Sequence, residues 1–319
     1  MRAANEYGLG EWLIGLPLVH GLKRARNVLL ERTFRSARSR ETDKLLAKHS
    51  GLAGGSLVMS IAFNQPWVID LLTRMTKRHL EGTLIVLDNS RNSEARREIA
   101  RICADRDVPY LGLPFNPERH PCRSNGIAMT WGYYNIVREL RPKTFAFFDH
   151  DLIPTAPLDI ASLVQSQPVY GVLNHSAWGW NLWAGYCIYD FASVERFALD
   201  FNNDNPRLLD TGGRNWLQIY RYLDRSKVLF ADWRREWLRD PADQAPRLVS
   251  FADDLLHVGG AGFGEHRNSR NEPELFQRLI RRFEDGATLD ELRCIVRHVQ
   301  PARLHGNADR IAEKSEGSR

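Results

Sequence analysis

Cysteine is scarce in this chain, and the spacing of its few copies excludes two kinds of site. The four residues, Cys103, Cys122, Cys187 and Cys294, include no C-x-x-C pair. Paired spacing is typical of zinc sites and of the disulfide frameworks of small secreted domains, so we expect neither here. A reducing compartment, the cytoplasm, fits this cysteine usage best.

Long hydrophobic runs are lacking as well. The apolar run at residues 12–19 is shorter than the roughly 20 residues that cross a bilayer, and no small-residue cleavage site precedes the charges that follow. We therefore expect neither a transmembrane helix nor a signal peptide.

Basic residues dominate the segment that follows. Between residues 22 and 48 nine basic side chains face three acidic ones, within a net charge of +5 for the 319 residues. We predict that residues 1–55 form a basic helical extension packed on the rest of the protein. Peripheral contact with anionic lipid at the inner face of the membrane is the alternative.

Strands and helices alternate through the first half of the chain. This pattern predicts an α/β fold with a mostly parallel central sheet flanked by helices, and with helical extensions at the N- and C-terminal sides. The second half is less regular, and residues 232–250 carry no clear pattern. Expected strands lie at 57–63, 82–87, 108–113, 143–149, 169–174 and 228–231, and expected helices at 66–80, 94–105, 124–140, 190–200, 215–223, from 272 onward and at 290–299.

Two carboxylates stand one residue apart where an apolar strand ends, at Asp149 and Asp151. Ligands of open α/β sheets collect at the carboxyl ends of strands. A pair of carboxylates together with a bound diphosphate suits Mg²⁺ or Mn²⁺, so the spacing predicts a metal site for a nucleotide diphosphate compound. The alternative is that Asp-x-Asp caps the following turn.

Several short motifs occur in a fixed order along residues 57–264. They are Phe63-Asn64 after the first strand, Asp88-Asn89-Ser90 after the second, Gly126-x-Ala128 in the helix before the fourth, Asp149-x-Asp151 with Pro154 behind it, and a Trp-Gly stretch followed by a further acidic residue. In combination they resemble the GT-A (Rossmann-like) fold of nucleotide-sugar glycosyltransferases, in particular the family 2 type. The resemblance predicts a catalytic domain at 56–264, C-terminal helices at 265–305 and a disordered tail at 306–319.

The resemblance implies roles for the residues at these motifs. Phe63, Asn64 and Asp88 would hold the base and ribose of the donor, and Asp149 would face the ribose or the metal. Asp151 would bind the metal directly. For Asp88 an ordinary turn is the alternative, because Asp-Asn-Ser favours turns.

A histidine placed late in the catalytic domain completes the metal site in several GT-A enzymes, and His257 is the matching residue. Imidazole is an acceptable ligand for Mn²⁺. A hydrogen-bonded core histidine is the alternative. The glycines that follow His257 let a backbone approach a pyrophosphate but do not form a P-loop, since Gly-Lys-Ser/Thr is missing.

The resemblance also implies a carboxylate base downstream of the metal motif. Asp210 is the best match, with Asp200 and Asp204 as rivals and a turn or N-cap role as the alternative. Arg214 lies nearby in the sequence and would meet a phosphate or pair with Asp210.

Three tryptophans, Trp178, Trp180 and Trp183, are crowded between the metal motif and Asp210. An indole face suits the C–H side of a sugar ring, so we predict that at least one lines an acceptor cleft. Tryptophan is buried on average, so a core position is the alternative for each. We expect the three to divide between these positions.

These features predict a metal-dependent glycosyltransferase of the hexosyltransferase type. It would use Mn²⁺ or Mg²⁺ and move a sugar from a UDP-sugar to a carbohydrate or lipid-linked acceptor in polysaccharide assembly. One alternative is a sugar-phosphate nucleotidyltransferase, whose glycine-rich basic signature is missing from residues 60–65. The other is a non-catalytic nucleic-acid-binding protein, suggested by the pI near 9.1 and by the arginine-rich N-terminal segment.

Overall fold

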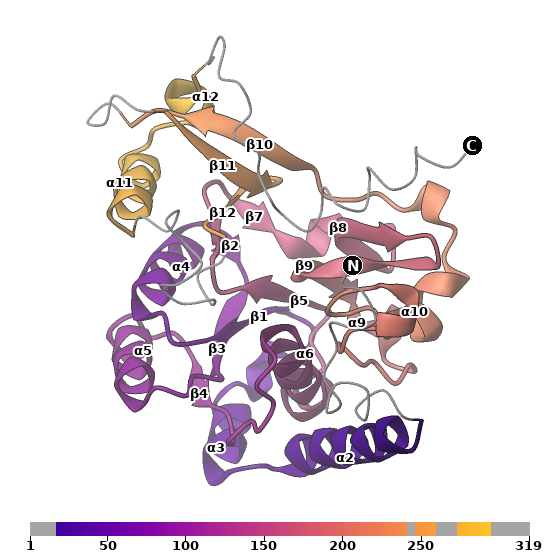
Figure 1. Cartoon of the computed structure of the whole chain (residues 1–319). Helices are drawn as coiled ribbons and strands as arrows, with labels where there is room; N and C mark the ends of the chain where they lie inside the picture. The colour runs from indigo at the N-terminus through magenta and orange to yellow at the C-terminus, as the bar shows by residue number, and fades with distance from the viewer. Residues whose placement is uncertain (1–16, 241–245, 260–272, 295–319) are drawn as a thin grey trace, which may run out of the picture.

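The computed structural model describes residues 17–240, 246–259 and 273–294. Its centre is a six-stranded sheet, drawn in the middle of Figure 1. The strands lie in the order β4 (Tyr110–Gly112), β3 (Thr83–Asp88), β1 (Ser56–Ala62), β5 (Thr144–Asp149), β9 (Gly179–Asp190) and β8 (Val169–Ser176).

The first four strands in this order are parallel, and β9 runs antiparallel to both β5 and β8. The predicted α/β fold with a mostly parallel central sheet is therefore confirmed. Parallel strands need crossover connections. Helices provide them between β1 and β3, between β3 and β4, and between β4 and β5.

Both faces of the central sheet are buried. Successive side chains of a strand point to opposite faces of the sheet, so each strand contributes to two cores. In β1, Val58 belongs to one hydrophobic core and Leu57 to the other, and β3 divides Val86 and Ile85 in the same way. Each core is completed by helices. One core contains residues of α4 (Pro66–His79), α5 (Ser93–Asp105) and α11 (Pro273–Glu284), and the other contains residues of α2 (Pro17–Ser36), α3 (Arg40–Lys48) and α6 (Pro121–Gly132).

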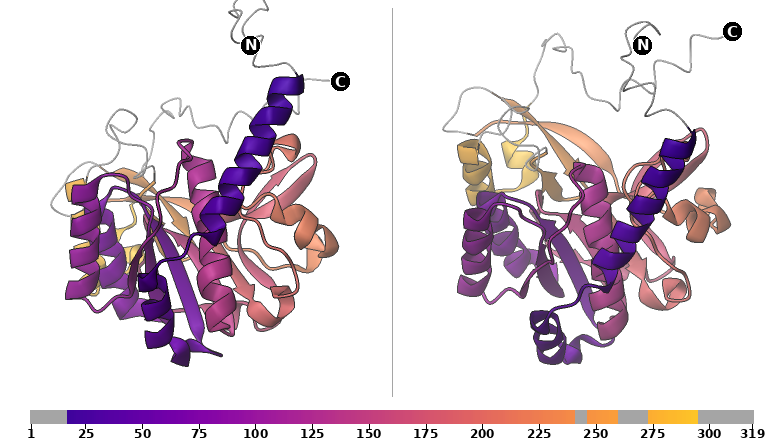
Figure 2. Two further views of the ribbon diagram at one scale, coloured as in Figure 1. Left: turned by 90° about the horizontal axis from the view of Figure 1, so that it is seen from below. Right: turned by 60° about the horizontal axis from the view of Figure 1, so that its bottom comes forward.

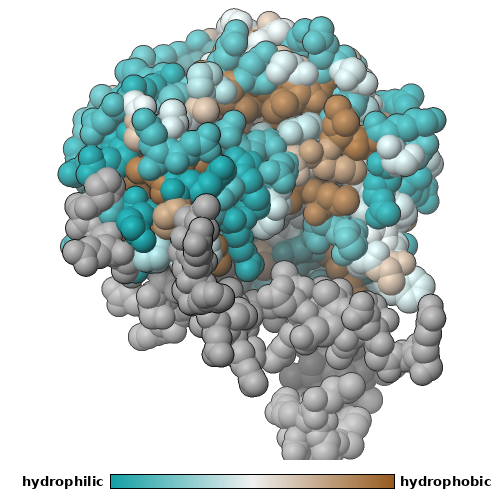
Figure 3. Space-filling view, turned by 90° about the horizontal axis from the view of Figure 1, so that it is seen from above, coloured by the Kyte–Doolittle hydropathy of each residue, from teal (hydrophilic) through white to brown (hydrophobic). Residues whose placement is uncertain are grey.

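A second, antiparallel sheet continues from the end of β5. Its strands lie in the order β10 (Trp233–Leu238), β11 (Arg247–Ala252), β12 (Leu255–His257) and β6 (Leu152–Pro154). Figure 3 looks down on the side of the molecule that carries this sheet at the top of Figure 1, where hydrophobic side chains gather in patches among hydrophilic ones. A short parallel pair, β2 (Leu80–Glu81) and β7 (Leu158–Asp159), lies beside it.

The remaining helical elements are short. They are α7 (Arg138–Leu140), α8 (Ile160–Leu163), α9 (Phe191–Val194), α10 (Asn215–Gln218), α12 (Leu289–Leu292), a π-helical turn at Tyr133–Val137, and 3-10 turns at Ser50–Leu52, Asn205–Arg207, Tyr220–Tyr222 and Arg225–Lys227.

Several predicted elements of the second half are wrong in extent. The helix expected at 190–200 ends at Val194, because the following segment extends into the core to bury Leu199 and Phe201. The helix expected at 215–223 breaks after Gln218, and no strand forms at 228–231. The helix expected at 290–299 starts at Leu289 and ends at Leu292.

The structure gives no information on some predicted segments. Residues 1–16 of the N-terminal extension, the glycines at 260–264, the part of the C-terminal region at 265–272 and 295–305, and the tail at 306–319 lie outside the described residues.

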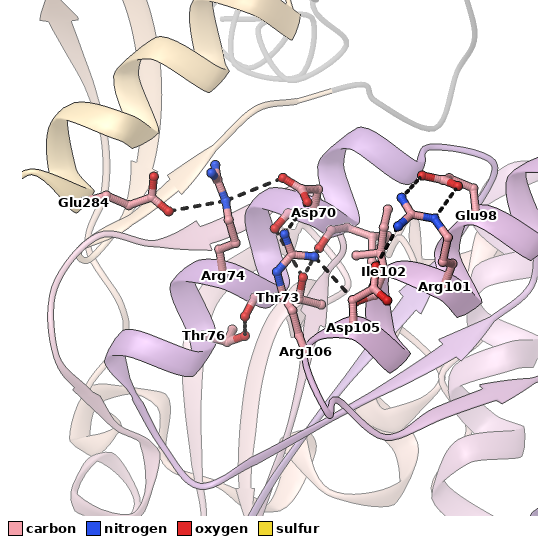
Figure 4. A network of polar contacts seen from close by, with 11 residues as sticks. Asp70, Thr73, Arg74, Thr76, Glu98, Arg101, Ile102, Asp105, Arg106 and Glu284 are labelled. Atoms are coloured by element: carbon pink, nitrogen blue, oxygen red, sulfur yellow. Dashed lines mark hydrogen bonds and ion pairs between the residues drawn. The ribbon is translucent and has the colours of Figure 1, made fainter.

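The C-terminal helix α11 packs on α4, and charged side chains fasten the two together. Glu284 of α11 forms an ion pair with Arg74 of α4, and Arg74 also pairs with Asp70. Asp70 in turn binds Arg106 at the end of α5, as Figure 4 shows. The apolar face predicted for α11 is buried, at Leu275, Phe276, Leu279, Ile280 and Phe283.

The helix α2 crosses α6, and its N-terminal end projects beyond the body of the molecule (Figure 2). Its Phe34 is buried, whereas Leu22 and Leu29 are each 65% exposed. Within the residues that the structure describes, no helix combines the length and the apolar character needed to cross a membrane.

Candidate functional site

The candidate metal ligands lie where the two sheets meet, at the carboxyl end of β5. Asp149 is the last residue of β5 and pairs with Ile61 of β1. The intervening His150 anchors the turn, because its Nδ1 lies 3.1 Å from the carbonyl oxygen of Ile61. Asp151 then precedes β6, so the chain passes from one sheet to the other between the two carboxylates.

Strand pairing brings His257 to this point. The antiparallel register of β12 and β6 sets His257 opposite Leu152, and the next amide, Val258 N–H, donates to the carbonyl oxygen of Asp151 at 2.9 Å. The His257 Nε2 atom lies 3.6 Å from Asp151 Oδ1. One ligand atom from each of Asp149, Asp151 and His257 lies within 4.8 Å of the other two.

The electrostatics of this triad suit a divalent cation. Burial, and then the charge of Asp151, raises the pKa of Asp149 to about 6. Burial lowers the pKa of His257, but the carboxylates of Asp151 and Asp149 outweigh that effect and hold it above its ordinary value. Two crowded carboxylates beside an imidazole are relieved by a cation, and hard oxygen donors with one imidazole match Mn²⁺ better than Mg²⁺. The triad is therefore positioned to bind a metal.

Two tryptophans hold the His257 ring. Trp183 of β9 and Trp233 of β10 both meet it edge to face, with centroids 5.1 Å and 5.4 Å away. Packing of this kind fixes the orientation of the imidazole and excludes water from its flanks. The imidazole of His257 is thus held by aromatic residues of both sheets.

The triad opens into a cavity of about 380 Å³. The lining includes Phe63, Asn89 and Arg91 from the loops after β1 and β3, together with the start of α6. The full lining is Ile61, Phe63, Asn89, Arg91, Glu118, Arg119, Pro121, Cys122, Ser124, Asn125, Asp149, His150, Asp151, Trp183, Ala184, Asp210, Thr211 and His257.

Asp210 reaches this cavity from a loop distant in sequence. Its Oδ1 accepts the Thr211 N–H at 2.7 Å, a contact that fixes the carboxylate. It lies close to Cys122, whose pKa is raised to about 11 by burial and then by the charge of Asp210. An exposed carboxylate therefore lines the same cavity as the triad.

Comparison with known proteins identifies solved structures of partial similarity. No protein-family model matches the chain, and no curated protein matches its sequence. One similar structure is the mannosyltransferase PcManGT from Pyrobaculum calidifontis, in complex with GDP-Man and Mn²⁺, at 12% identity and a TM-score of 0.34, covering 52% of this chain and 58% of that one. Another is glucosyl-3-phosphoglycerate synthase from Mycobacterium tuberculosis, in complex with Mn²⁺, UDP and glucosyl-3-phosphoglycerate, at 16% identity and a TM-score of 0.29, covering 44% and 50%.

The chain spans 58% of the length of the first of these structures and 50% of the length of the second. Both likenesses are partial and concern the fold alone. At these TM-scores they carry no argument about function. The function is therefore inferred from the side chains that line the cavity.

Two residues predicted to bind the donor nucleotide have other partners. Asp88 is buried, and its two oxygens accept the Ser90 N–H at 2.8 Å and the Tyr110 hydroxyl at 2.9 Å. Asn64 has a positive φ of 55°, and its Oδ1 accepts the amides of Arg91 and Asn92. Neither lines the cavity, and the contact between Asp88 and the Ser90 N–H is the turn given above as the alternative for Asp88.

The residues considered as partners or rivals of Asp210 lie elsewhere. Asp200 accepts a hydrogen bond from Arg214 at 2.8 Å, and the largely buried Asp204 forms an ion pair with Arg207. Neither lines the cavity at the triad, which is called the metal cavity below. The prediction that Arg214 meets a phosphate there or pairs with Asp210 is wrong, since its guanidinium binds Asp200 and Glu31 instead.

The three tryptophans divide, as expected. Trp183 lines the cavity. Trp180 is 4% exposed and packs against Tyr220, Phe230 and Trp216, so it offers no ring face to an acceptor and its predicted binding role is wrong. Trp178 is 66% exposed but does not line the cavity.

Sequence reasoning missed the basic side of the cavity, which Arg91 and Arg119 form together with the start of α6. One signal was available. Pro121 occupies the first position of α6, where proline is favoured because its missing N–H would have no helical partner. Starting the helix there instead of at 124 would have placed its N-terminus beside the carboxyl ends of β1 and β3.

Proposed function

We propose that this protein is a metal-dependent glycosyltransferase that moves a hexose from a nucleotide diphosphate donor to a carbohydrate or lipid-linked acceptor. The observation that carries the proposal is the convergence of Asp149, Asp151 and His257 within 4.8 Å at the wall of a 380 Å³ cavity that also holds arginines and a carboxylate. Such a cavity offers ligands to a metal ion, positive charge to a bound anion and a carboxylate to a reacting group.

The basic side of the cavity supports a diphosphate. Arg91 and Arg119 supply guanidinium donors, and the first turn of α6 presents backbone amides with the positive end of the helix dipole. Helix N-termini and arginines are both favourable partners of phosphate oxygens. The donor diphosphate would lie between these groups and the triad.

For the base we propose a UDP donor, held by Phe63 and Asn89. The Oδ1 atom of Asn89 is buried without a hydrogen-bond partner, while its Nδ2 donates to Ser124 Oγ at 3.0 Å. An unpaired buried acceptor in a ligand cavity is costly unless a ligand donates to it. The N3–H of uracil is such a donor, and this assigns to Asn89 the role that the sequence suggested for Asp88.

When bound at the triad, Mn²⁺ or Mg²⁺ would neutralise charge that develops on the departing diphosphate. The chain's own groups would do the rest. Asp149 and Asp151 would hold the metal, and Arg91 and Arg119 would share the negative charge of the leaving group. Asp210 would remove the proton from the acceptor hydroxyl, for which its solvent-facing, amide-anchored carboxylate is suited.

The acceptor would approach past Trp183, whose ring meets the cavity beside His257. Aromatic faces are good surfaces for sugar rings. We place the enzyme in cytoplasmic polysaccharide assembly. The exposed Leu22 and Leu29 beside the basic side chains of α2 support peripheral contact with anionic lipid.

Calorimetric titration tests class and base together. UDP, GDP and CDP are titrated with and without Mn²⁺, using the intact protein and the variants Asp151→Ala and Asn89→Leu. We expect metal-dependent binding with UDP strongest, loss in Asp151→Ala, and loss of the preference for UDP in Asn89→Leu. Full metal-dependent binding by Asp151→Ala would refute the proposal.

The rival functions predict other outcomes. A nucleotidyltransferase would release pyrophosphate from UTP and a sugar phosphate. Nucleic-acid binding would be steeply salt-dependent and unaffected by EDTA.

A further inference from the structure

A second cavity, of about 340 Å³, lies on the other side of α6, where α2 and the 198–218 segment meet. Its side chains come from three parts of the chain that are far apart in sequence. The lining residues are Val28, Glu31, Arg32, Arg35, Ile127, Thr130, Tyr134, Ala198, Leu199, Asp200, Asn202, Arg214 and Gln218.

Three guanidinium groups and two carboxylates line this cavity. Arg214 binds both carboxylates, with Nη1 at 3.0 Å from Glu31 and 2.8 Å from Asp200. Arg35 lies over the ring of Tyr134 at 4.7 Å. Within the part of the chain that the structure describes, neither Arg32 nor Arg35 forms an ion pair. Two arginines therefore retain their capacity to bind an anion.

Asn202 adds an acceptor to the same wall. It is 3% exposed, and its Nδ2 donates to Asp200 Oδ1 at 2.7 Å. Its Oδ1 is buried and has no hydrogen-bond partner among the residues that the structure describes. A buried acceptor in this state is stabilised by a donor from a ligand. A hydroxyl group is such a donor, and it would not be repelled by the neighbouring carboxylates.

We propose that this cavity binds a small phosphorylated compound with hydroxyl groups, of the size of a sugar phosphate. Arg32 and Arg35 would bind the phosphate, since arginine matches its oxygens with paired donors. A hydroxyl would donate to Asn202 Oδ1. Ile127 and Leu199 supply the apolar surface on which a ring lies.

The two cavities are separate but joined by an ionic chain. Arg123 binds Glu118 at 3.1 Å, and Glu118 lines the metal cavity. The same guanidinium lies 3.6 Å from Glu31, which lines the second cavity and binds Arg214. A ligand in the second cavity thus occupies a site different from that of the donor.

The second cavity also borders the loop that carries Asp210. The Gly212 N–H donates to the carbonyl oxygen of Phe201 at 2.7 Å, and the Arg214 N–H to that of Asn202 at 3.1 Å. A ligand bound to Asn202 would therefore hold the loop on the C-terminal side of Asp210. A ligand in the second cavity would thereby regulate the proposed transfer. This regulation rests on the proposed function, whereas binding of the ligand does not.

Calorimetry with EDTA present separates this site from the metal cavity. Glucose 6-phosphate, inorganic phosphate and glucose are titrated into the intact protein, into the double variant Arg32→Gln/Arg35→Gln, and into Arg26→Gln, an exposed arginine of α2 that does not line the cavity. We expect glucose 6-phosphate to bind more tightly than phosphate and glucose to bind not at all. The double variant should lose at least tenfold in affinity, and Arg26→Gln should match the intact protein.

Hydrogen exchange supplies a second measurement on the same protein. Glucose 6-phosphate should protect amides of residues 199–215 in both the intact protein and Asp151→Ala. Equal binding by the double variant, failure of glucose 6-phosphate to bind, or loss of its binding in Asp151→Ala would each overturn the proposal. Loss of nucleotide binding alone would overturn the proposed function and leave this site standing.

Discussion

His257 is held at the triad by three contacts of two kinds, with a carboxylate at 3.6 Å and with the rings of two tryptophans. The aromatic contacts would keep a similar planar side chain in place, so the variant His257→Gln should fold normally. It would lose the imidazole donor, and we expect Mn²⁺ affinity to fall by at least tenfold, measured by calorimetry. His175→Gln on the exposed part of β8 is the matched control. Unchanged affinity in His257→Gln would exclude a ligand role.

Proton competition makes metal binding depend on pH. The pKa of Asp149 is raised to about 6, and that of His257 also lies above its ordinary value. A metal must displace both protons, so Mn²⁺ affinity should fall as pH is lowered through 6. Titrations between pH 8 and pH 5 measure it.

The same shifts predict how stability changes without metal. Because the folded protein raises both pKa values, its favourable protonated forms are present at low pH and lost as pH rises through them. The melting temperature of the metal-free protein should therefore fall between pH 5 and pH 8, and Mn²⁺ should raise it most at pH 8. An equal effect of Mn²⁺ at both ends would contradict the assignment.

Asp210 allows a test that separates chemistry from binding. In Asp210→Asn the side chain keeps its shape and loses its basicity, so we expect kcat to fall by about 10²–10⁴ while binding of the metal and nucleotide stays unchanged. Asp224→Asn, an exposed carboxylate beside Arg225–Lys227, is the control. Full turnover in Asp210→Asn would require a different base.

At the residue scale, sequence reasoning identified groups but not their partners. Asp149, Asp151, His257, Asp210 and Phe63 reach one cavity as predicted from the motifs. Asp88 does not, because Tyr110, 22 positions later, takes one of its oxygens. Contacts between side chains so far apart leave no trace in a single sequence, and the unpaired Oδ1 of Asn89 is equally invisible there.

At the element scale, α6 and the segment after α9 pack at backbone distance. A Cβ at Gly126 would lie 2.6 Å from the carbonyl oxygen of Phe201 and 2.9 Å from Asn202 Cα. The variant Gly126→Ala must displace backbone, and overpacking of this kind costs about 1–3 kcal/mol. Urea unfolding measures it. Gly51→Ala, with nothing within 4 Å, is the control, and equal stability of the two variants would show that the segment yields freely.

Elements were predicted well where a strand or helix carries its own pattern. The strands and helices from β1 to β5 are marked by local patterns, because each long helix buries one repeated face and each strand is a continuous apolar run. The helix expected at 190–200 failed for a physical reason. Phe197, Leu199 and Phe201 all reach the core, a spacing of two that an extended segment satisfies and a helix does not.

At the scale of the whole molecule, α11 belongs to the core that α4 and α5 share. Ile280 is fully buried in that core, so Ile280→Ala should lower the free energy of unfolding by about 2–5 kcal/mol. We expect a single, shifted transition in calorimetry rather than separate melting of the C-terminal helix. Arg281→Ala on the exposed face is the control. Two transitions would show that α11 unfolds independently.

The sequence alone did not predict which element α11 packs against. Its apolar face predicts burial, and the charges at Arg74 and Glu284 are individually unremarkable in a sequence. Which surface the helix covers depends on the path of the preceding sheet, and β10 and β11 fall in the stretch where no pattern was visible. The sequence of the first half of the chain therefore predicted the central sheet but not the surface that α11 covers.

The pairing of β12 with β6 has a consequence for synthesis. A chain emerging from the ribosome displays Asp149 and Asp151 early, but the imidazole of His257 follows more than a hundred residues later. At roughly 5–20 residues per second, an unfinished polypeptide spends several seconds without its third ligand. Newly made protein would thus complete the cluster of Asp149, Asp151 and His257 only after His257 has been translated.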